Sequence, residues 1–283
     1  MAYNQDKGET MSTLTETYTL HNGIKIPKIA FGTWQIPNEE AYQAVLDALA
    51  VGYRHIDTAK SYHNEEAVGR AIKDSGIARE DIFVVSKLRA PAIGYNETIA
   101  SFEAQLKELG LDYLDLYLIH APWNWSDRSV SVTPQNIEAW RAMEDLYKQG
   151  KIKSIGVSNF SVSDLQALLD NGTIVPMVNQ IRFSVGFTQD EIVAFCQKNN
   201  ILIEAYSPLG TGSVFSDPKL EVMAKNYDVS IAQLCIQYCL EKNTLPLPKT
   251  RSKDRMIQNA TLDFSIKPED MKVLDAFEEI QRL

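Results

Sequence analysis

Eight short apolar segments, each followed by an amphipathic helical pattern, recur along most of this 283-residue chain. The helical patterns repeat apolar residues every three or four positions, as at Phe102, Leu106 and Leu109. The expected strands cover residues 29–33, 53–57, 82–86, 114–119, 152–157, 177–181, 201–205 and 244–247. A doubly wound sheet rarely holds eight such evenly spaced units, and no linker divides them. We therefore predict an α/β fold, a single (β/α)8 TIM barrel.

A further element is expected before the first barrel strand. Asn22-Gly23 stands between two short alternating patterns within residues 18–27, and Asn-Gly is the strongest short-range signal for a hairpin. We expect this β-hairpin to cover the bottom of the barrel. Residues 1–15 are expected to be a disordered leader, which leaves residues 16–283 as one barrel domain.

The composition narrows the classes of partner. The formal net charge of −9 disfavours nucleic acid or an anionic membrane as the main partner. No segment has the pattern of a signal peptide or a membrane span. Cys196, Cys235 and Cys239 are an odd number without disulfide or metal-ligand spacing, which fits a reducing compartment. We expect a cytoplasmic protein that binds a small molecule and no metal, as a monomer or weak dimer.

Polar and aromatic residues follow the expected strands, where the carboxyl ends of barrel strands converge on one mouth. They are Trp34, Asp57, Lys87, His120, Ser158, Asn159, Gln180, Tyr206, Ser207, Pro248 and Lys249. Asp57, Lys87 and His120 follow the second, third and fourth strands, so they should be neighbours around the rim. Tyr62 lies in the loop that follows Asp57.

Together, these four residues would form a device that donates a proton. A phenol with its ordinary pKa of about 10 is a poor donor at neutral pH. The Lys87 ammonium, held by the Asp57 carboxylate, would lower the pKa of Tyr62. His120 could orient or help to protonate a carbonyl oxygen. The set suits carbonyl reduction, with hydride from another source.

Structural interpretations of the same residues stay open when each is taken alone: a solvated lysine, a hydrogen-bonded loop histidine, a packed tyrosine. Other chemistries have weaker support. Residues 210–215 lack the third glycine of a dinucleotide fingerprint, and neither a phosphate loop nor His-Glu-x-x-His is present. Only four histidines occur in the chain, which disfavours a His-rich metal barrel.

The sequence at these positions resembles the aldo-keto reductase family. Residues 52–62 read Gly-Tyr-Arg-His-Ile-Asp-Thr-Ala-Lys-Ser-Tyr and match the family's signature, and Asn64-Glu65 follows in the usual place. Further blocks fit in collinear order at residues 85–88, 116–120, 156–160, 178–180, 204–210 and 247–250. The resemblance spans about residues 17–280. In its length and in residues 114–120, the chain looks like short prokaryotic members, similar to 2,5-diketogluconate and glyoxal reductases.

The resemblance implies an activity and a role for each matching residue. Tyr62 would donate the proton, Asp57 and Lys87 would lower its pKa, and His120 would orient the carbonyl. The implied function is NADPH-dependent reduction of aldehydes or ketones to alcohols. The alternative is a catalytically weak or inactive NADPH-binding scaffold or sensor of the same fold.

The resemblance also implies a binding site for NADPH/NADP⁺. The expected contacts are Thr33, Ser158, Asn159, Gln180, Tyr206, Ser207, Leu209, Gly210, Ser213, Lys249, Thr250, Arg255, Gln258 and Asn259. Ser158, Asn159 and Gln180 would hold the nicotinamide carboxamide, with Tyr206 stacked on the ring. Lys249 and Arg255 would bind the adenosine 2′-phosphate, a charge-assisted contact that favours NADPH over NADH.

Departures from the family pattern bear on the substrate. Trp34, Trp123 and Trp125 are expected to line an open pocket, because Ala121 follows His120 where a tryptophan is frequent. Arg89 stands where many relatives carry an aromatic residue. If Arg89 reaches the pocket, an anionic or polyhydroxy substrate is favoured; a surface arginine on an outer loop is the competing interpretation.

Overall fold

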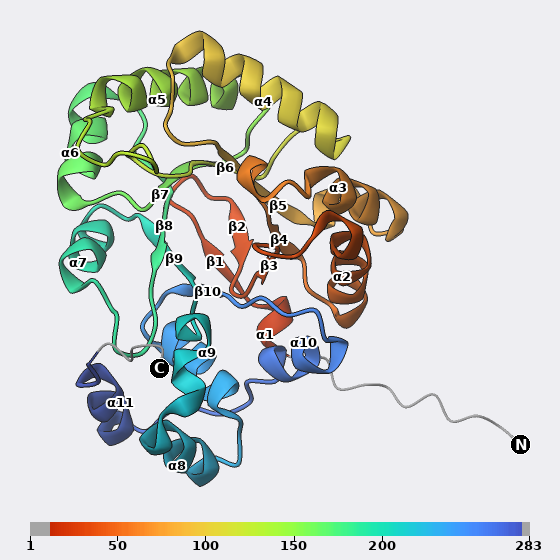
Figure 1. Ribbon diagram of the computed structural model, residues 1–283, viewed down its shortest axis with the longest axis vertical. Helices are drawn as coiled ribbons and strands as arrows, with labels where there is room; N and C mark the ends of the chain where they lie inside the picture. Colours follow the sequence, from red (N-terminus) through yellow and green to blue (C-terminus); the bar gives the residue numbers. More distant parts are fainter. Residues whose placement is uncertain (1–11, 279–283) are drawn as a thin grey trace, which may run out of the picture.

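Eight parallel strands form the centre of the molecule (Figure 1). The computed structural model describes residues 12–278. The strands are β3 (Phe31–Gly32), β4 (His55–Asp57), β5 (Phe83–Leu88), β6 (Leu116–Ile119), β7 (Ile155–Ser158), β8 (Val178–Arg182), β9 (Leu202–Tyr206) and β10 (Leu245–Leu247). Each pairs with its neighbours in chain order. The N–H groups of Ala30 and Gly32 donate to the carbonyls of Pro246 and Pro248, at 3.1 and 3.2 Å, and join the last strand to the first. The predicted TIM barrel is confirmed.

Helices surround the barrel and cover the outer face of its strands (Figure 1). They are α2 (Asn38–Val51), α3 (Glu65–Asp74), α4 (Tyr95–Leu109), α5 (Thr133–Lys148), α6 (Val162–Asn171), α7 (Asp190–Lys198), α8 (Pro218–Asn226), α9 (Ile231–Glu241), α10 (Lys253–Ala260) and α11 (Pro268–Asp275). Short 3₁₀ segments occur in the connections: η1 (Lys60–Tyr62), η2 (Arg79–Asp81) and η3 (Gly210–Ser216). Over residues 12–278, none of the helices combines the length and apolar character needed to cross a membrane.

Sequence signals at several helix starts explain where the helices begin. Ser161 and Asp164 form a capping box at α6, and Ser230 and Gln233 form another at α9. In each pair the serine side chain accepts a hydrogen bond from a backbone N–H that has no partner inside the helix, which stabilises the first turn. The first box thus fixes the connection from β7 to α6, and the second fixes the connection from α8 to α9.

The strands are buried on both faces. Every residue of β5 and β6 is buried, including Lys87, because the barrel core lies on one side and helices lie on the other. On the helix side, the side chains of Trp140 and Met143 in α5 are fully buried. Such close packing makes the strand ends rigid supports for the side chains that follow them.

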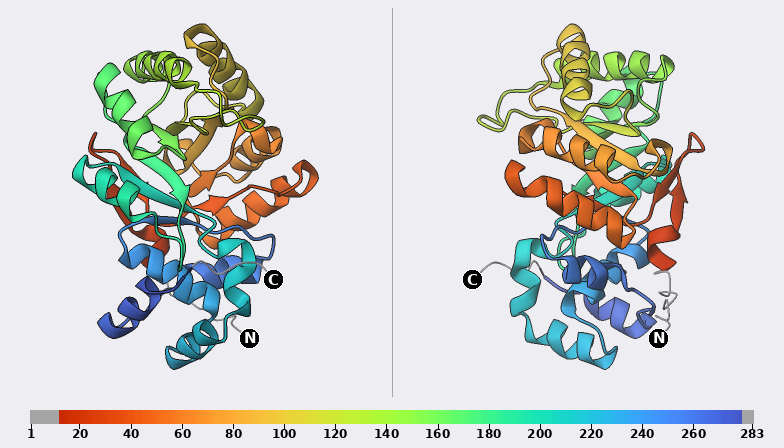
Figure 2. Two further views of the ribbon diagram at one scale, coloured as in Figure 1. Left: turned by 60° about the vertical axis from the view of Figure 1, so that its left-hand side comes forward. Right: turned by 90° about the vertical axis from the view of Figure 1, so that its right-hand side faces the viewer.

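The predicted hairpin is present and lies at the bottom of the barrel. Strands β1 (Thr17–Thr19) and β2 (Lys25–Pro27) pair antiparallel. The Tyr18 hydroxyl donates to the carbonyl of Thr244 (3.4 Å), and the Asn22 amide donates to that of Lys153 (3.0 Å), just before β10 and β7. Figure 2 shows the hairpin, in red, and the loop after β6, in yellow-green, at opposite ends of the barrel.

Several expected boundaries differ from the observed ones. The first strand is limited to Phe31–Gly32 instead of residues 29–33, and β5 extends to Leu88, two residues beyond its expected end. Hydrogen bonding between backbones decides where a strand begins and ends, and the spacing of apolar residues in the sequence does not reveal these hydrogen bonds.

The expected disordered leader of residues 1–15 lies mostly outside the described residues. Its last four residues form the helix α1 (Ser12–Thr15), which corrects the expected boundary. Leu14 is buried there near Gly52, the residue that ends α2, so this apolar side chain supplies a contact that holds the segment on the barrel.

Candidate active site

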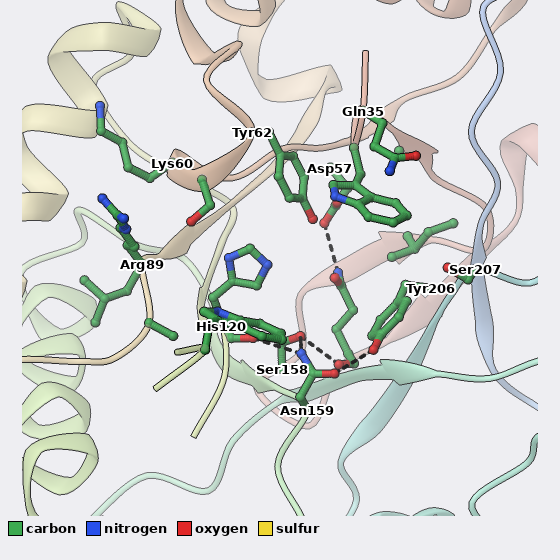
Figure 3. A pocket seen from close by; sticks show the side chains of 18 of the residues that line it. Gln35, Asp57, Lys60, Tyr62, Arg89, His120, Ser158, Asn159, Tyr206 and Ser207 are labelled. Carbon is green, nitrogen blue, oxygen red and sulfur yellow. Dashed lines mark hydrogen bonds between the residues drawn. The ribbon is translucent and has the colours of Figure 1, made fainter. Parts of the chain in front are cut away.

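A cavity of about 1250 Å³ opens at the carboxyl ends of the barrel strands. Of the residues expected at the site, Trp34, Asp57, Tyr62, His120, Trp125, Ser158, Asn159, Gln180, Tyr206, Ser207, Leu209 and Lys249 line it. Figure 3 shows Tyr62, Asp57 and His120 in the middle of this cavity, with Tyr206 and Ser207 on one side and Arg89 on the other. The eight barrel strands thus bring together residues that lie up to 215 positions apart, from Trp34 to Lys249.

Lys87 lies beneath the cavity floor, between Asp57 and Tyr62. Its ammonium donates to both carboxylate oxygens of Asp57, at 2.8 and 2.7 Å, and to the carbonyl of Thr58 at 3.0 Å. A fourth contact, of 3.3 Å, joins the ammonium to the Tyr62 hydroxyl oxygen. Lys87 is fully buried, and the negative charge of Asp57 compensates the positive charge of its ammonium. Burial lowers the pKa of Lys87, but the attraction of Asp57 and Tyr62 outweighs it and the pKa is raised.

The pKa of Tyr62 departs from the expected direction. Burial raises it to about 12, and the nearby Lys87 ammonium lowers it only in part. The expectation that Lys87 would bring the phenol below its ordinary pKa is therefore wrong as a net effect. The charge of Lys87 is largely compensated by Asp57, which itself raises the pKa of Tyr62. Tyr62 is a protonated phenol at neutral pH.

His120 faces Tyr62 across the cavity as a neutral imidazole. The two ring centroids are 5.6 Å apart in an edge-to-face arrangement. Burial, together with the charge of Lys87, lowers the pKa of His120 to about 3. Its Nδ1 is buried without a hydrogen-bond partner among the described residues. A neutral histidine can donate a hydrogen bond to an oxygen but has no extra proton to transfer, so orientation is the role its surroundings favour over protonation.

The turn that carries Tyr62 is held by buried polar groups. Tyr62 ends η1, and Asn64 follows it as a fully buried residue. The Asn64 amide donates to the carbonyls of Thr33 and Ile36, at 3.1 and 3.0 Å, while its oxygen accepts from the Thr58 hydroxyl at 2.8 Å. These bonds join the ends of β3 and β4 and fix the position of the phenol.

A chain of hydrogen bonds crosses the side of the cavity next to His120 (Figure 3). The Asn159 amide donates to the His120 carbonyl and to the Ser158 hydroxyl oxygen, both at 3.0 Å. The Tyr206 hydroxyl donates to the Asn159 side-chain oxygen at 2.8 Å. The Ser158 hydroxyl donates in turn to the carbonyl of Gln180 at 2.9 Å. The ring of Tyr206 is thus anchored at the wall of the cavity.

Gln180 connects the site to a second buried carboxyl group, which the sequence did not identify. Its amide nitrogen donates to Asp57 Oδ2 at 2.9 Å and to Glu204 Oε2 at 2.7 Å. Burial raises the pKa of Glu204 to about 8, with Asp57 as the next cause, and burial lowers the pKa of His55 to about 3. Glu204 Oε1 lies 3.7 Å from His55 Nε2, and both atoms lack a hydrogen bond among the described residues. The one sequence signal was a lone acidic residue inside the apolar segment 201–205.

A second concavity, lined by Lys249, Thr250, Arg251, Ser252 and Arg255, adjoins the first through Lys249. Ser252 caps α10 by accepting a hydrogen bond from the Arg255 N–H (3.4 Å), so the helix presents its N-terminus to this concavity. Lys249, Arg255 and the helix N-terminus favour an anion such as a phosphate group, while the third cation, Arg251, is paired with Glu40 at 2.6 Å. Arg251 and Ser252 are additions to the residues expected from the sequence.

The other expected contacts lie outside both cavities. They are Thr33, Trp123, Gly210, Ser213, Gln258 and Asn259. Thr33 is buried and donates to the Asp57 carbonyl (2.9 Å), and Trp123 lies behind Trp125 at a ring distance of 5.7 Å. In η3, Thr211 and Gly212 reach the cavity in place of Gly210 and Ser213. No group of three or more His, Cys, Asp or Glu residues within 12–278 could hold a metal ion.

Comparisons with known proteins agree with this geometry. A model of the aldo/keto reductase family matches residues 28–279. The glyoxal reductase of Bacillus subtilis is 42% identical over 274 residues, which cover 96% of each chain. A solved aldo/keto reductase from Brucella melitensis superposes with a TM-score of 0.86 at 41% identity, over 92% of this chain and 98% of that one. A Bombyx mori aldo-keto reductase, solved in complex with NADP, gives 0.85 at 35% identity over 94% of each chain. The chain belongs to the aldo/keto reductase family.

Proposed function

We propose that this protein is an NADPH-dependent reductase that converts aldehydes or ketones to alcohols, with Tyr62 as the proton donor. The observation that carries the proposal is the position of the Lys87 ammonium, 2.7 Å from Asp57 and 3.3 Å from the Tyr62 hydroxyl, directly beneath a large open cavity. The glyoxal reductase of B. subtilis, 42% identical to this chain, supports the same reaction class.

In the proposed mechanism, the carbonyl oxygen lies between the Tyr62 hydroxyl and the His120 ring. Neutral His120 donates a hydrogen bond to this oxygen and orients it. Tyr62 then transfers its proton to the oxygen as negative charge develops there. The raised pKa keeps the phenol protonated before the reaction. The proton is then transferred because a developing alkoxide is a stronger base than phenolate. The phenolate that remains is stabilised by Lys87.

The residues present fit an NADPH molecule. When bound, the cofactor would supply the hydride for the carbonyl carbon. Tyr206, anchored by Asn159, would support the nicotinamide ring at the middle of the cavity. The second concavity, with Lys249, Arg251 and Arg255, would hold the adenosine 2′-phosphate. The Bombyx mori relative, solved in complex with NADP, supports this choice of cofactor.

The experiment that tests the function is NADPH oxidation by the purified protein with a panel of aldehydes that includes methylglyoxal and butanal. Replacing Tyr62 by phenylalanine removes the proton and keeps the ring, so kcat should fall about 10²- to 10⁴-fold while NADPH binding, followed by fluorescence, is retained. Tight NADPH binding without turnover of any carbonyl compound would favour the scaffold or sensor alternative and refute the reductase function.

A further inference from the structure

We propose that the substrate of this enzyme carries a carboxylate a few atoms away from its carbonyl group, and that Arg89 is the residue that binds this carboxylate. The inference rests on the proposed reductase function and specifies the chemical class of its substrate. Arg89 is exposed to solvent and also lines the main cavity.

Arg89 is held next to His120 by the barrel itself. Lys87 pairs with Leu118 and Leu88 pairs with Ile119 in the parallel ladder of β5 and β6. The His120 N–H donates to the Leu88 carbonyl at 3.1 Å, so the register continues one residue beyond the two strands. Arg89 and His120 are therefore the next pair across the ladder, on chains about 4.8 Å apart.

The place of Arg89 relative to Lys87 follows from its position directly after β5, which ends at Leu88. Lys87 points to Asp57 and Tyr62. Arg89, two residues after Lys87 and just beyond the strand, lies nearer the open mouth and lines the cavity. Figure 3 shows Arg89 on the side of Tyr62 and His120 that faces away from Tyr206. A compound whose carbonyl lies between Tyr62 and His120 would extend toward this guanidinium.

The charges around the cavity leave Arg89 available for a ligand. Among the described residues, the guanidinium of Arg89 makes neither an ion pair nor a hydrogen bond, whereas Lys60 is paired with Glu108. The Asp57 carboxylate is compensated by Lys87. The other acidic residue of the wall, Glu97, is exposed and has no ion-pair partner in residues 12–278. A guanidinium presents a planar fork of donors that matches a carboxylate, so an anionic group is the ligand chemistry that this wall recognises.

The test compares two aldehydes of the same chain length. Succinic semialdehyde carries a carboxylate and butanal does not. Initial rates of NADPH oxidation give kcat and KM for the wild type, Arg89→Gln, Arg89→Lys, and Arg70→Gln as a control. Arg70 is exposed on α3 in an ion pair with Glu66, so its replacement removes the same charge from the outer surface.

We expect Arg89→Gln to lower kcat/KM for succinic semialdehyde about tenfold or more, mainly through KM, and to leave butanal within about twofold. Arg89→Lys should give an intermediate loss, and Arg70→Gln should change neither substrate. Equal effects of Arg89→Gln on both aldehydes, or no effect on either, would overturn the inference while the reductase function stands. If the wild type reduces neither aldehyde, nor any other member of the panel, the proposed function fails and the inference fails with it.

Discussion

Replacement of Glu204 by glutamine would test whether this carboxyl group is protonated inside the folded barrel. Glu204 is fully buried, accepts a hydrogen bond from Gln180 at 2.7 Å and has a pKa raised to about 8 from an ordinary value of 4.5, chiefly by burial. Glutamine has nearly the shape of the protonated acid. Its oxygen can accept the Gln180 bond, and its amide would lie beside His55 Nε2 in place of Glu204 Oε1.

The sign of the effect follows from proton binding. Between pH 4.5 and about 8, the folded protein holds a proton on Glu204 that the unfolded chain has lost. The contribution of this group to stability is therefore complete below pH 4.5 and is lost as pH rises through about 8, by up to about 1.4 kcal/mol per pH unit. From about pH 6 to about pH 8 the wild type should lose up to about 3 kcal/mol through this group alone. The variant does not titrate there, so its stability relative to the wild type should rise by that amount. His55 does not interfere, because its pKa of about 3 keeps it neutral in the folded protein at both pH values.

Urea unfolding of both proteins at the two pH values measures this difference, because titrations shared by wild type and variant cancel in the comparison. Glu144→Gln is the matched control. Glu144 is also buried, but its carboxylate accepts backbone hydrogen bonds from Thr173 and Ile174, at 2.6 and 2.7 Å, so this variant should be less stable than the wild type at both pH values. A difference between Glu204→Gln and the wild type that stays constant from pH 6 to pH 8 would refute protonation of Glu204.

Two further predictions concern the cofactor and the packing of the helices. Arg255→Ala should raise the KM for NADPH about ten- to hundredfold and leave that for NADH unchanged, because the lost contact is with the 2′-phosphate; an unchanged NADPH/NADH preference would refute the assignment. Gly69→Ala should destabilise the fold by about 1–3 kcal/mol in thermal or urea unfolding. Alanine normally favours a helix over glycine, but here its Cβ would lie 1.9 Å from the Leu109 carbonyl oxygen, so unfolding at wild-type stability would contradict the packing described.

The proximity of the catalytic residues was the part of the site that the sequence predicted best. Asp57, Lys87 and His120 lie at the carboxyl ends of successive strands, and the geometry of a parallel barrel brings successive strand ends together whatever the details of packing. Their neighbours farther from the strands were less predictable. Gln258 lies outside the cavities, and Trp123 lies behind Trp125, because loop and helix orientations depend on contacts that no local pattern encodes.

The alternation of apolar strands and amphipathic helices by itself determined the barrel, and the residues that follow each strand determined which side chains meet at its mouth. Only the tertiary structure decided their protonation states. The pKa of Tyr62 rises instead of falling, and that of Glu204 is raised to about 8, because desolvation depends on everything packed around a group. Gln180 and Asp57, 123 residues apart, share a hydrogen bond that periodicity could not reveal. Arg89 was ambiguous in the sequence for the same reason, and the register of β5 against β6 is what places it beside His120.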